Sequence, residues 1–590
     1  MFSKISFVLS YRRLPIIAAI LSVLLLIGTI WQGLRVDDYH HRAAIIDPDS
    51  GGYCAKGDPI HLFDFMDGEP QLTNKLIEKG HAPWWTDPEV KISFFRPLSV
   101  LTHLLDYKLW PNHPEMMHAQ NLLWLFALVI AVGLFYRRLF GKGALIAAGL
   151  ALILFALDDA HIETVSWIAQ RNALIAMFLG VLSLIAYHKN RVEGWKLGAY
   201  LSPVLFSLAI LAGEAGITTM AYLIPYTIFL DSRKWSERIR PLLPFFIIIL
   251  IWRIGTTMAG FSVENTDYYI NPSQQPLHFI LTALFRLPIL ITGLFTPISA
   301  SFALYGPPET SMRLLLLGCM VIILLAAIFW PLLQKDKNAR FFAAATILAL
   351  VPCCAVGPSN RLLIWSSLGA MGFLSCILIS SFNRESIYRP TSRSLRFLWG
   401  AVSILIVIVH LLIAPVLRPI LVNSSKELRQ KVYVSLPNDP SLKDQSIIIV
   451  NGPLVFAASH LQVMQAAENL PVPKHTRILS PSFASIELNR IDDYTLILHP
   501  DGGYLKVILD ALVCSRYKPL PVGHRIELSD LKIEVLSITS DGRPERIACQ
   551  FGVPLEDNSL RWIFWQDGRY KSWTPLKVGQ KVKLPPALLF

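Results

Sequence analysis

Charged residues are scarce in this chain of 590 residues: 16% are Asp, Glu, Lys or Arg, whereas 53% are hydrophobic. The mean hydropathy of +0.46 lies outside the range of an ordinary soluble protein of this length. Low-complexity segments and internal repeats of solenoid length are absent. The seven cysteines do not indicate a function, although Cys514 and Cys549 could form a disulfide. This composition predicts an integral membrane protein.

Long apolar runs recur from Leu14 to about Val422 and then stop. The first, LPIIAAILSVLLLIGTIWQGL, is too long for a secretory signal and no small-x-small cleavage site follows it, so we expect a retained signal anchor. The net charge of +12 could suggest nucleic-acid binding. The basic residues, however, stand in short clusters between apolar runs, which indicates membrane topology and no nucleic-acid partner.

The basic clusters predict a multi-pass protein of the cytoplasmic (inner) membrane with a cytoplasmic N-terminus and an extracytoplasmic C-terminal domain. Segment 276–298 breaks the alternation of inward and outward spans, and its Pro288 and Pro297 favour an interfacial or re-entrant helix pair. The expected fold is therefore a polytopic α-helical membrane protein of about 11 spans plus this segment. The predicted spans lie near 14–34, 117–136, 143–158, 171–188, 197–212, 216–231, 241–257, 313–334, 341–357, 361–381 and 397–421.

Two hydrophilic regions accompany these spans: a first outer loop, 35–116, within the membrane domain 1–422, and a soluble tail, 423–590. In the loop, FFRPLSVLTHLLDYKLW (94–110) has the apolar spacing of a helix lying in the membrane interface. The tail holds short β-rich runs bounded by Gly, Pro and Asp, and RWIFWQDGRYKSW predicts a hairpin around Asp567-Gly568. We expect a β-rich α+β domain with its own core. The hairpin's aromatic residues could stack on sugar rings, although core packing is the ordinary role for alternate residues of a strand.

Ionisable residues gather at the predicted outer ends of the spans, where charge is costly and each group needs a partner or a function. On a continuous helix, Glu163, Trp167 and Arg171 would share one face. Glu214 stands between two apolar runs with no cation beside it in the sequence. Solvated loop ends, interfacial networks and snorkelling arginines are the ordinary alternatives. The group comprises Asp37, Asp38, Asp158, Asp159, His161, Glu163, Arg171, Glu214 and Arg361.

Four stretches carry a resemblance when taken in order. FRPLSVLTHLLDYKLWPNHPEMMHAQNLLWL, HIETVSWIAQRNALIAMFLGVLSLIAYHK, LAILAGEAGITTMAYLIPYTIFLD and SNRLLIWSSLGAMGFL together span roughly residues 30–380. They resemble motifs of the GT-C superfamily of glycosyltransferases, which use polyprenyl-phosphate sugars. The nearest resemblance is to the membrane half of the O-mannosyltransferases that carry tetratricopeptide repeats and to their bacterial homologues.

The resemblance implies roles for particular residues. It makes Asp37 or Asp38 the catalytic aspartate of the first outer loop and Glu163 the second acidic residue of the catalytic set. Arg96, Arg171 and Arg361 become candidates for donor or phosphate contacts, and His118, Asn121, His161 and Glu214 become supporting residues. The chain departs from the family pattern where Gly213 replaces a lysine, Asp159-Ala160 replaces His-Pro, and Leu362 and Ile364 replace aromatic residues.

The implied reaction is transfer of a hexose or pentose from a polyprenyl-phosphate donor to a glycan, lipid or protein acceptor. A carboxylate of the first outer loop would act as general base, with inversion at the sugar carbon, while cations stabilise the departing phosphate. No cofactor is certain, although the two aspartates with His40, His41 and His161 could hold a divalent cation. The alternatives are a transporter or flippase of lipid-linked sugar, with Glu214 as ion site, and an inactive scaffold.

Overall fold

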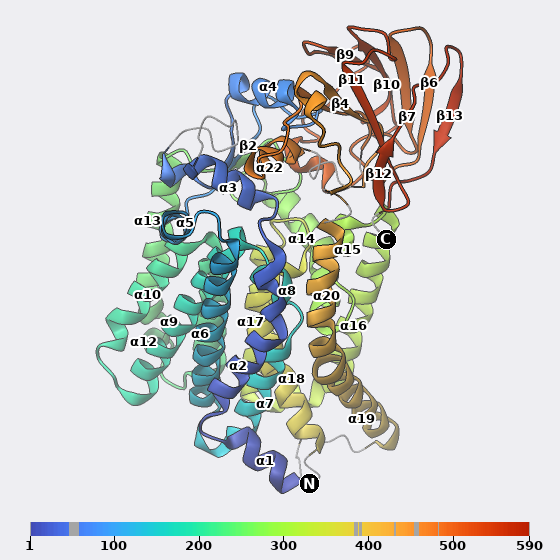
Figure 1. Ribbon diagram of the computed structural model, residues 1–590. Helices are drawn as coiled ribbons and strands as arrows, with labels where there is room; N and C mark the ends of the chain where they lie inside the picture. The colour runs from blue at the N-terminus through green and yellow to red at the C-terminus, as the bar shows by residue number, and fades with distance from the viewer. Residues whose placement is uncertain are drawn as a thin grey trace.

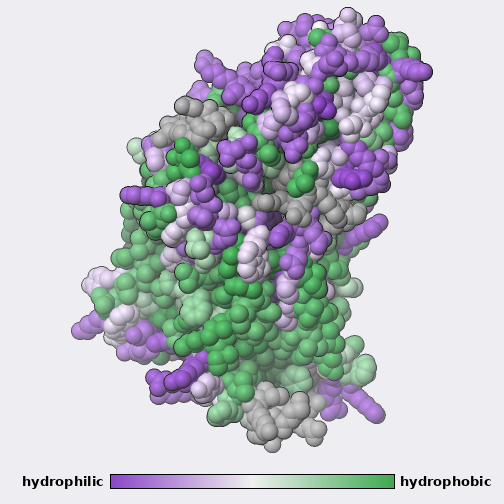
Figure 2. All heavy atoms as spheres, viewed as in Figure 1, coloured by the Kyte–Doolittle hydropathy of each residue, from purple (hydrophilic) through white to green (hydrophobic). Residues whose placement is uncertain are grey.

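The computed structural model describes residues 2–46, 58–382, 388, 392–429, 432, 434–453, 459–481 and 483–588. A bundle of long helices has the β-rich C-terminal region at one end (Figure 1). In the view of Figure 2, hydrophobic residues cover most of the helical part, and hydrophilic residues dominate the C-terminal region. Together with the apolar helices, this distribution is that of a multi-pass membrane protein.

Among the described residues, eight helical segments are long and apolar enough to cross a membrane. Their helices are α2 (Leu14–Leu26), α6 (Pro114–Phe140), α9 (Arg171–Glu193), α12 (Trp235–Ile239) continuing into α13 (Leu243–Met258), α14 (Pro276–Phe295), α16 (Pro308–Lys335), α18 (Ile364–Phe382), and α19 (Arg393–Val407) continuing into α20 (Ala414–Arg429). Shorter helices of the bundle are α1 (Phe2–Ser10), α7 (Leu145–Leu157), α10 (Gly198–Ala212), α11 (Met220–Pro225), α15 (Phe302–Tyr305) and α17 (Lys337–Cys353). The number of spans and their orientation stay predictions.

Helix α18 lies inside the bundle and α16 at its periphery. In the most apolar window, 89% of the α18 residues are buried, against 22% of those in α16. Gly369 and Gly372 let α18 approach α17 closely, since a Cβ atom at Gly372 would lie 2.4 Å from the Phe342 ring and one at Gly369 would lie 2.9 Å from the Thr346 backbone nitrogen. Small residues at an interface let helices pack closely in lipid, where apolar surface alone gives no driving force.

The structure of segment 276–298 differs from the predicted pair of helices. It contains one helix of 20 residues, α14, and this helix is a candidate membrane span rather than an interfacial or re-entrant pair. Pro288 lies inside the helix without ending it, and the Thr292 hydroxyl donates to the Pro288 carbonyl at 3.3 Å.

The first outer loop lies at the end of the bundle that carries the tail, and it packs against the tail (Figure 1). It contains α3 (Asp37–Ile46), α4 (Pro70–Lys79) and α5 (Pro97–Leu109). Leu101, Leu105 and Leu109 of α5 are exposed, as expected of an interfacial helix. Strands β1 (Asp64–Asp67), β2 (Lys91–Ser93) and β3 (Val263–Glu264) form a small sheet that ties this loop to the segment preceding α14.

The tail contains two sheets. A six-stranded sheet has the order β13-β6-β7-β10-β9-β8 and a four-stranded sheet has the order β12-β11-β4-β5. The first is antiparallel throughout, whereas β4 pairs in parallel with both β5 and β11. The elements are β4 (Ser446–Ile449), α22 (Leu461–Ala467), β5 (His475–Ile478), β6 (Ile486–Arg490), β7 (Thr495–Pro500), β8 (Arg525–Glu527), β9 (Leu531–Ile538), β10 (Pro544–Phe551), β11 (Leu560–Gln566), β12 (Arg569–Ser572) and β13 (Lys581–Leu584).

The hairpin predicted around Asp567-Gly568 joins β11 to β12. Both turn residues have positive φ, 52° and 74°, as a type I′ turn requires. Trp562 and Trp565 are buried, and their indole N–H groups donate to backbone carbonyls at 2.8 Å. These two tryptophans therefore belong to the core of the tail.

The core of the tail continues into the first outer loop. One buried cluster includes Tyr39 and Trp85 of the loop together with Ile448 and Leu498 of the tail. Cys514 and Cys549, which could have formed a disulfide, are both free thiols in the buried core. Helix α20 runs across the predicted domain boundary at 422/423, which stays a prediction.

Candidate active site

Asp37 and Asp38 begin α3, directly after the chain leaves the first membrane segment. The bend has positive φ at Gly33 (67°) and at Val36 (35°). Asp38 is fully buried, and its carboxylate accepts hydrogen bonds from the backbone N–H groups of Ala169 at 2.7 Å and Arg35 at 2.9 Å. Burial nevertheless raises the pKa of Asp38 to about 7, against the lowering effect of these two bonds. Asp38 thus fixes α3 to the chain around Ala169.

Asp37 has a different environment. Its side chain is 22% exposed to solvent, and its Oδ1 lies 4.0 Å from Nε2 of His460 in the tail. Burial raises the pKa of Asp37 to about 6, while the positive charges of Arg361 and Arg96 lower it. Of the two predicted aspartates, Asp37 is the one left available to a substrate.

Arg361 lies among aromatic rings. Its guanidinium carbon is 5.4 Å from the centre of the Trp167 ring, and Nη2 donates to the Tyr268 hydroxyl at 3.1 Å. Arg35 lies 5.9 Å from the same tryptophan ring and donates to the Ser166 hydroxyl at 2.9 Å. Two guanidinium groups therefore share one indole near Asp37, an arrangement that concentrates positive charge on an aromatic surface.

Arg96, at the start of α5, forms a two-pronged ion pair with Glu214. Nε donates to Oε2 at 2.8 Å, and Nη2 pairs with Oε1. The Arg96 guanidinium also lies 4.5 Å from the Phe94 ring and 4.8 Å from the Phe63 ring. Arg96 keeps the pKa of Glu214 below its ordinary value despite burial. Glu214, which has no cation beside it in the sequence, therefore gains one from a residue 118 positions away.

Glu163 lies on the short helix α8 (His161–Val165), and its carboxylate is bound by residues of two other segments. It accepts hydrogen bonds from the hydroxyls of Ser301 at 2.7 Å and Ser359 at 2.9 Å. The backbone N–H of Arg361 donates to the same carboxylate at 3.3 Å. Glu163 thereby connects α8 to the segment that carries Arg361.

Glu163, Trp167 and Arg171 do not share a helix face, contrary to the prediction. Helix α8 ends at Val165, the Trp167 backbone is extended (φ −123°, ψ 115°), and α9 begins at Arg171. This break turns Trp167 toward Arg361, whereas Arg171 enters the bundle interior.

Arg171 and its neighbours form a separate buried network. Arg171 pairs with Asp106 of α5, and its Nε donates to the Asn121 amide oxygen at 2.7 Å. Asn121 in turn donates to the Val165 carbonyl at 3.1 Å, and His118 contacts the Gly33 carbonyl at 2.9 Å. Arg171, His118 and Asn121 therefore support the site by positioning the loops that carry Asp37 and Glu163.

His161 is buried against Phe155, with ring centres 4.5 Å apart. Neither ring nitrogen has a hydrogen-bond partner within the described part of the chain, and burial holds the pKa of His161 well below its ordinary value. A neutral imidazole packed on an aromatic ring is a core residue.

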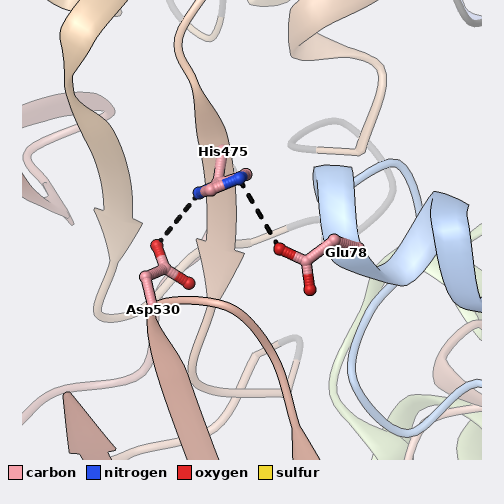
Figure 3. A group of neighbouring side chains, drawn as sticks. All are labelled: Glu78, His475 and Asp530. Carbon is pink, nitrogen blue, oxygen red and sulfur yellow. Dashed lines mark hydrogen bonds and ion pairs between the residues drawn. The ribbon is translucent and has the colours of Figure 1, made fainter. Parts of the chain in front are cut away.

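One group of described residues has the spacing of metal ligands: Glu78, His475 and Asp530 (Figure 3). Arg477 already supplies positive charge there, because its Nη2 lies 2.6 Å from Asp530 and 3.2 Å from Glu78. This group contains none of the residues predicted to hold a divalent cation, namely Asp37, Asp38, His40, His41 and His161. A divalent cation in the site stays a prediction.

Sequence reasoning missed Arg35, Tyr268, Asp106 and His460. Arg35 could have been found from its position two residues before Asp37. Tyr268 stands next to Tyr269 in a loop with no recognised motif, and His460 lies in the tail. Nothing in the sequence around either residue indicates that it belongs to the site. Only the packing of distant segments brings them to the site.

Comparison with known proteins finds relatives over part of the chain, and no family model matches. The chain is 32% identical over 178 residues to human protein O-mannosyl-transferase TMTC1, covering 28% of this chain and 19% of the relative. It is 29% identical over 179 residues to human protein O-mannosyl-transferase TMTC3, covering 29% and 19%. The chain therefore spans about a fifth of the length of the curated relatives it matches.

Two solved structures are similar at low sequence identity. The oligosaccharyltransferase of Archaeoglobus fulgidus is 14% identical with a TM-score of 0.36, covering 79% of this chain and 62% of that one. ArnT from Cupriavidus metallidurans, bound to undecaprenyl phosphate, is 12% identical with a TM-score of 0.34, covering 90% and 97%. The sequence relatives confirm the resemblance that the motifs indicated: over rather more than a quarter of its length, this chain is similar to the protein O-mannosyl-transferases TMTC1 and TMTC3.

Proposed function

We propose that this chain is a membrane glycosyltransferase that moves a sugar from a polyprenyl-phosphate donor to a glycan, lipid or protein acceptor. The site would lie at the outer face of the cytoplasmic membrane, with the N-terminus in the cytoplasm and the tail outside. The relatives support sugar transfer as the reaction class, and the apolar helices support residence in lipid.

The environment of Asp37 carries this proposal. A general base works best when its pKa lies near the working pH, and burial raises that of Asp37 to about 6. Arg361 and Arg96 act on the same carboxylate, and Arg361 offers the positive charge that a phosphate-linked donor needs. Asp38, whose oxygens accept two backbone hydrogen bonds, is the weaker candidate.

In the proposed reaction, the acceptor oxygen forms a bond to C1 of the donor sugar, and the bond between C1 and the phosphate oxygen breaks. The bonding electron pair leaves with the polyprenyl phosphate, and the acceptor proton passes to Asp37. A single displacement inverts the configuration at C1. Arg361 is suited to bind the departing phosphate because its planar guanidinium matches that group and Trp167 and Tyr268 hold it in place.

Glu163 and Glu214 have supporting roles in this scheme. Glu163 orients the Arg361 segment through its bonds to Ser359 and to the Arg361 backbone. Glu214 holds Arg96 against the Phe94 ring. A transporter that used Glu214 as its ion site would need this carboxylate free to exchange cations, and the ion pair with Arg96 disfavours that alternative.

Turnover of defined donors by the purified protein in nanodiscs tests the proposal. Radiolabelled undecaprenyl- and dolichyl-phosphate sugars are incubated with wild type, Asp37→Asn, Asp38→Asn and Glu163→Gln. Asp444→Asn is the matched control, since Asp444 is an exposed carboxylate of the tail. We expect donor consumption by wild type and the control and none by Asp37→Asn. Absence of turnover with every donor, or equal turnover by Asp37→Asn and wild type, contradicts the proposal and favours a scaffold or transporter.

A further inference from the structure

The tail is joined to the first outer loop by a network of ionic groups on α4, β5 and the turn before β9. His475 lies between Asp530, at 3.1 Å from Nδ1, and Glu78, at 3.6 Å from Nε2 (Figure 3). Arg477, whose side chain is only 2% exposed, pairs with both carboxylates. Because Arg477 is buried, separating it from these carboxylates would leave its charge unpaired, so the network holds the tail on the loop.

Hydrogen bonds outside this network also join the tail to the first outer loop. The Gln462 amide donates to the Lys79 carbonyl at 2.6 Å, the Asp87 N–H donates to the Val513 carbonyl at 2.8 Å, and the Tyr39 hydroxyl donates to Glu468 at 3.0 Å. The last of these bonds joins α3, which begins with Asp37, to the end of α22. The tail therefore forms one wall of the region around Asp37.

His460 is the residue that this packing brings to Asp37. It precedes α22, its side chain is 7% exposed, and its Nε2 faces Oδ1 of Asp37 at 4.0 Å. Its ring also lies edge-on to His40 of α3, with ring centres 4.6 Å apart. The separation from Asp37 exceeds a hydrogen bond, but contacts to a catalytic group commonly shorten when substrate binds.

We propose that His460 is a positioning residue for Asp37, through which the C-terminal region takes part in sugar transfer; this inference rests on the proposed function. With a proton on Nε2, the imidazole favours the ionised carboxylate and fixes the rotamer in which it meets the acceptor hydroxyl. After transfer, the Asp37 carboxyl, whose side chain is 22% exposed, releases the acceptor proton to solvent. The C-terminal region is thus part of the active site rather than a separate carbohydrate-binding module.

Other titratable groups surround this pair and must be considered in any pH dependence. Electrostatic effects on Asp37 come from the first outer loop, from the segment before α14 and from the segment before α18, and those on His460 come from α3 and from the end of α4. The groups are Asp38, Arg96, Tyr269 and Arg361 around Asp37, and His40 and His81 around His460.

The test compares His460→Gln and His460→Phe with wild type in the full-length protein. Glutamine keeps an N–H donor and phenylalanine keeps only the ring shape. His499→Gln is the matched control, because His499 lies on β7 of the tail with a side chain 39% exposed. Two readouts are taken: the acidic limb of the kcat/KM profile with pH, and the pH midpoint of Asp37 protonation from infrared difference spectra against Asp37→Asn without donor. Thermal unfolding confirms that each variant is folded.

We expect His460→Phe to move both midpoints upward by about half a pH unit or more, because the carboxylate loses a group that favours its ionised form. His460→Gln should lie between His460→Phe and wild type, and His499→Gln should match wild type. Midpoints that stay at the wild-type value in folded His460→Phe overturn the inference. If the infrared midpoint moves but no donor turns over in wild type, the contact between His460 and Asp37 stands and the proposed function fails.

Discussion

Replacing Asp37 by asparagine should abolish sugar transfer and, at the same time, stabilise the fold above pH 6. Burial raises the pKa of Asp37 from its ordinary value of 3.8 to about 6. A difference of about two pH units corresponds to roughly 3 kcal/mol of unfavourable free energy for the ionised carboxylate in the folded state. The side chain is only 22% exposed, so little of this cost is screened by solvent.

The sign of the pH dependence follows from the raised pKa. The folded protein binds the Asp37 proton more tightly than the unfolded chain does, so this contribution to stability is complete below pH 3.8 and is lost as the pH rises through about 6. Asparagine has nearly the same shape and carries no charge. The Asn variant should therefore equal wild type in stability near pH 4 and exceed it at pH 8 by up to about 3 kcal/mol.

Thermal unfolding in detergent between pH 4 and pH 8 measures this difference, and donor turnover in nanodiscs measures catalysis. Loss of a general base costs on the order of 100- to 10,000-fold in rate. A variant that gains stability at pH 8 while losing turnover shows that the Asp37 carboxylate is retained for chemistry. If Asp37→Asn is instead destabilised at pH 8, or turns over donor at the wild-type rate, the assignment of Asp37 as base is refuted.

Further substitutions separate supporting roles from catalytic ones. Near pH 4, Asp38→Asn should lower the free energy of unfolding by about 1–3 kcal/mol, seen as a lower Tm, because the amide oxygen can accept only one of the two backbone hydrogen bonds. Arg361→Lys should raise KM for the lipid donor with little change in Tm, since the planar fork is lost but the charge remains; an unchanged KM counts against phosphate binding. Glu214→Gln should lower Tm by leaving Arg96 unpaired, at a cost on the order of 2 kcal/mol. Arg477→Met should increase hydrogen exchange in α4 and β5, with the membrane helices unaffected.

The sequence by itself determined the features that depend on neighbouring residues. Apolar runs of membrane length located the long helices, and Asp567-Gly568 located a hairpin whose turn geometry only such residues adopt readily. The motifs that resemble O-mannosyltransferases agree with the relatives found. The α14 segment was misread because charge alternation says which side a loop lies on, and says nothing of whether a proline-containing helix stays continuous.

Tertiary structure alone decided which ionisable groups are paired. Adjacent in sequence, Asp37 and Asp38 look equivalent, yet the backbone of Ala169 engages only Asp38. Glu214 looks isolated until Arg96 reaches it across 118 residues, and His460 reaches Asp37 from the tail. The physical reason is that a helix or turn is set by contacts within a few residues, whereas the partner, burial and pKa of a charged group depend on segments that meet only when the whole chain packs.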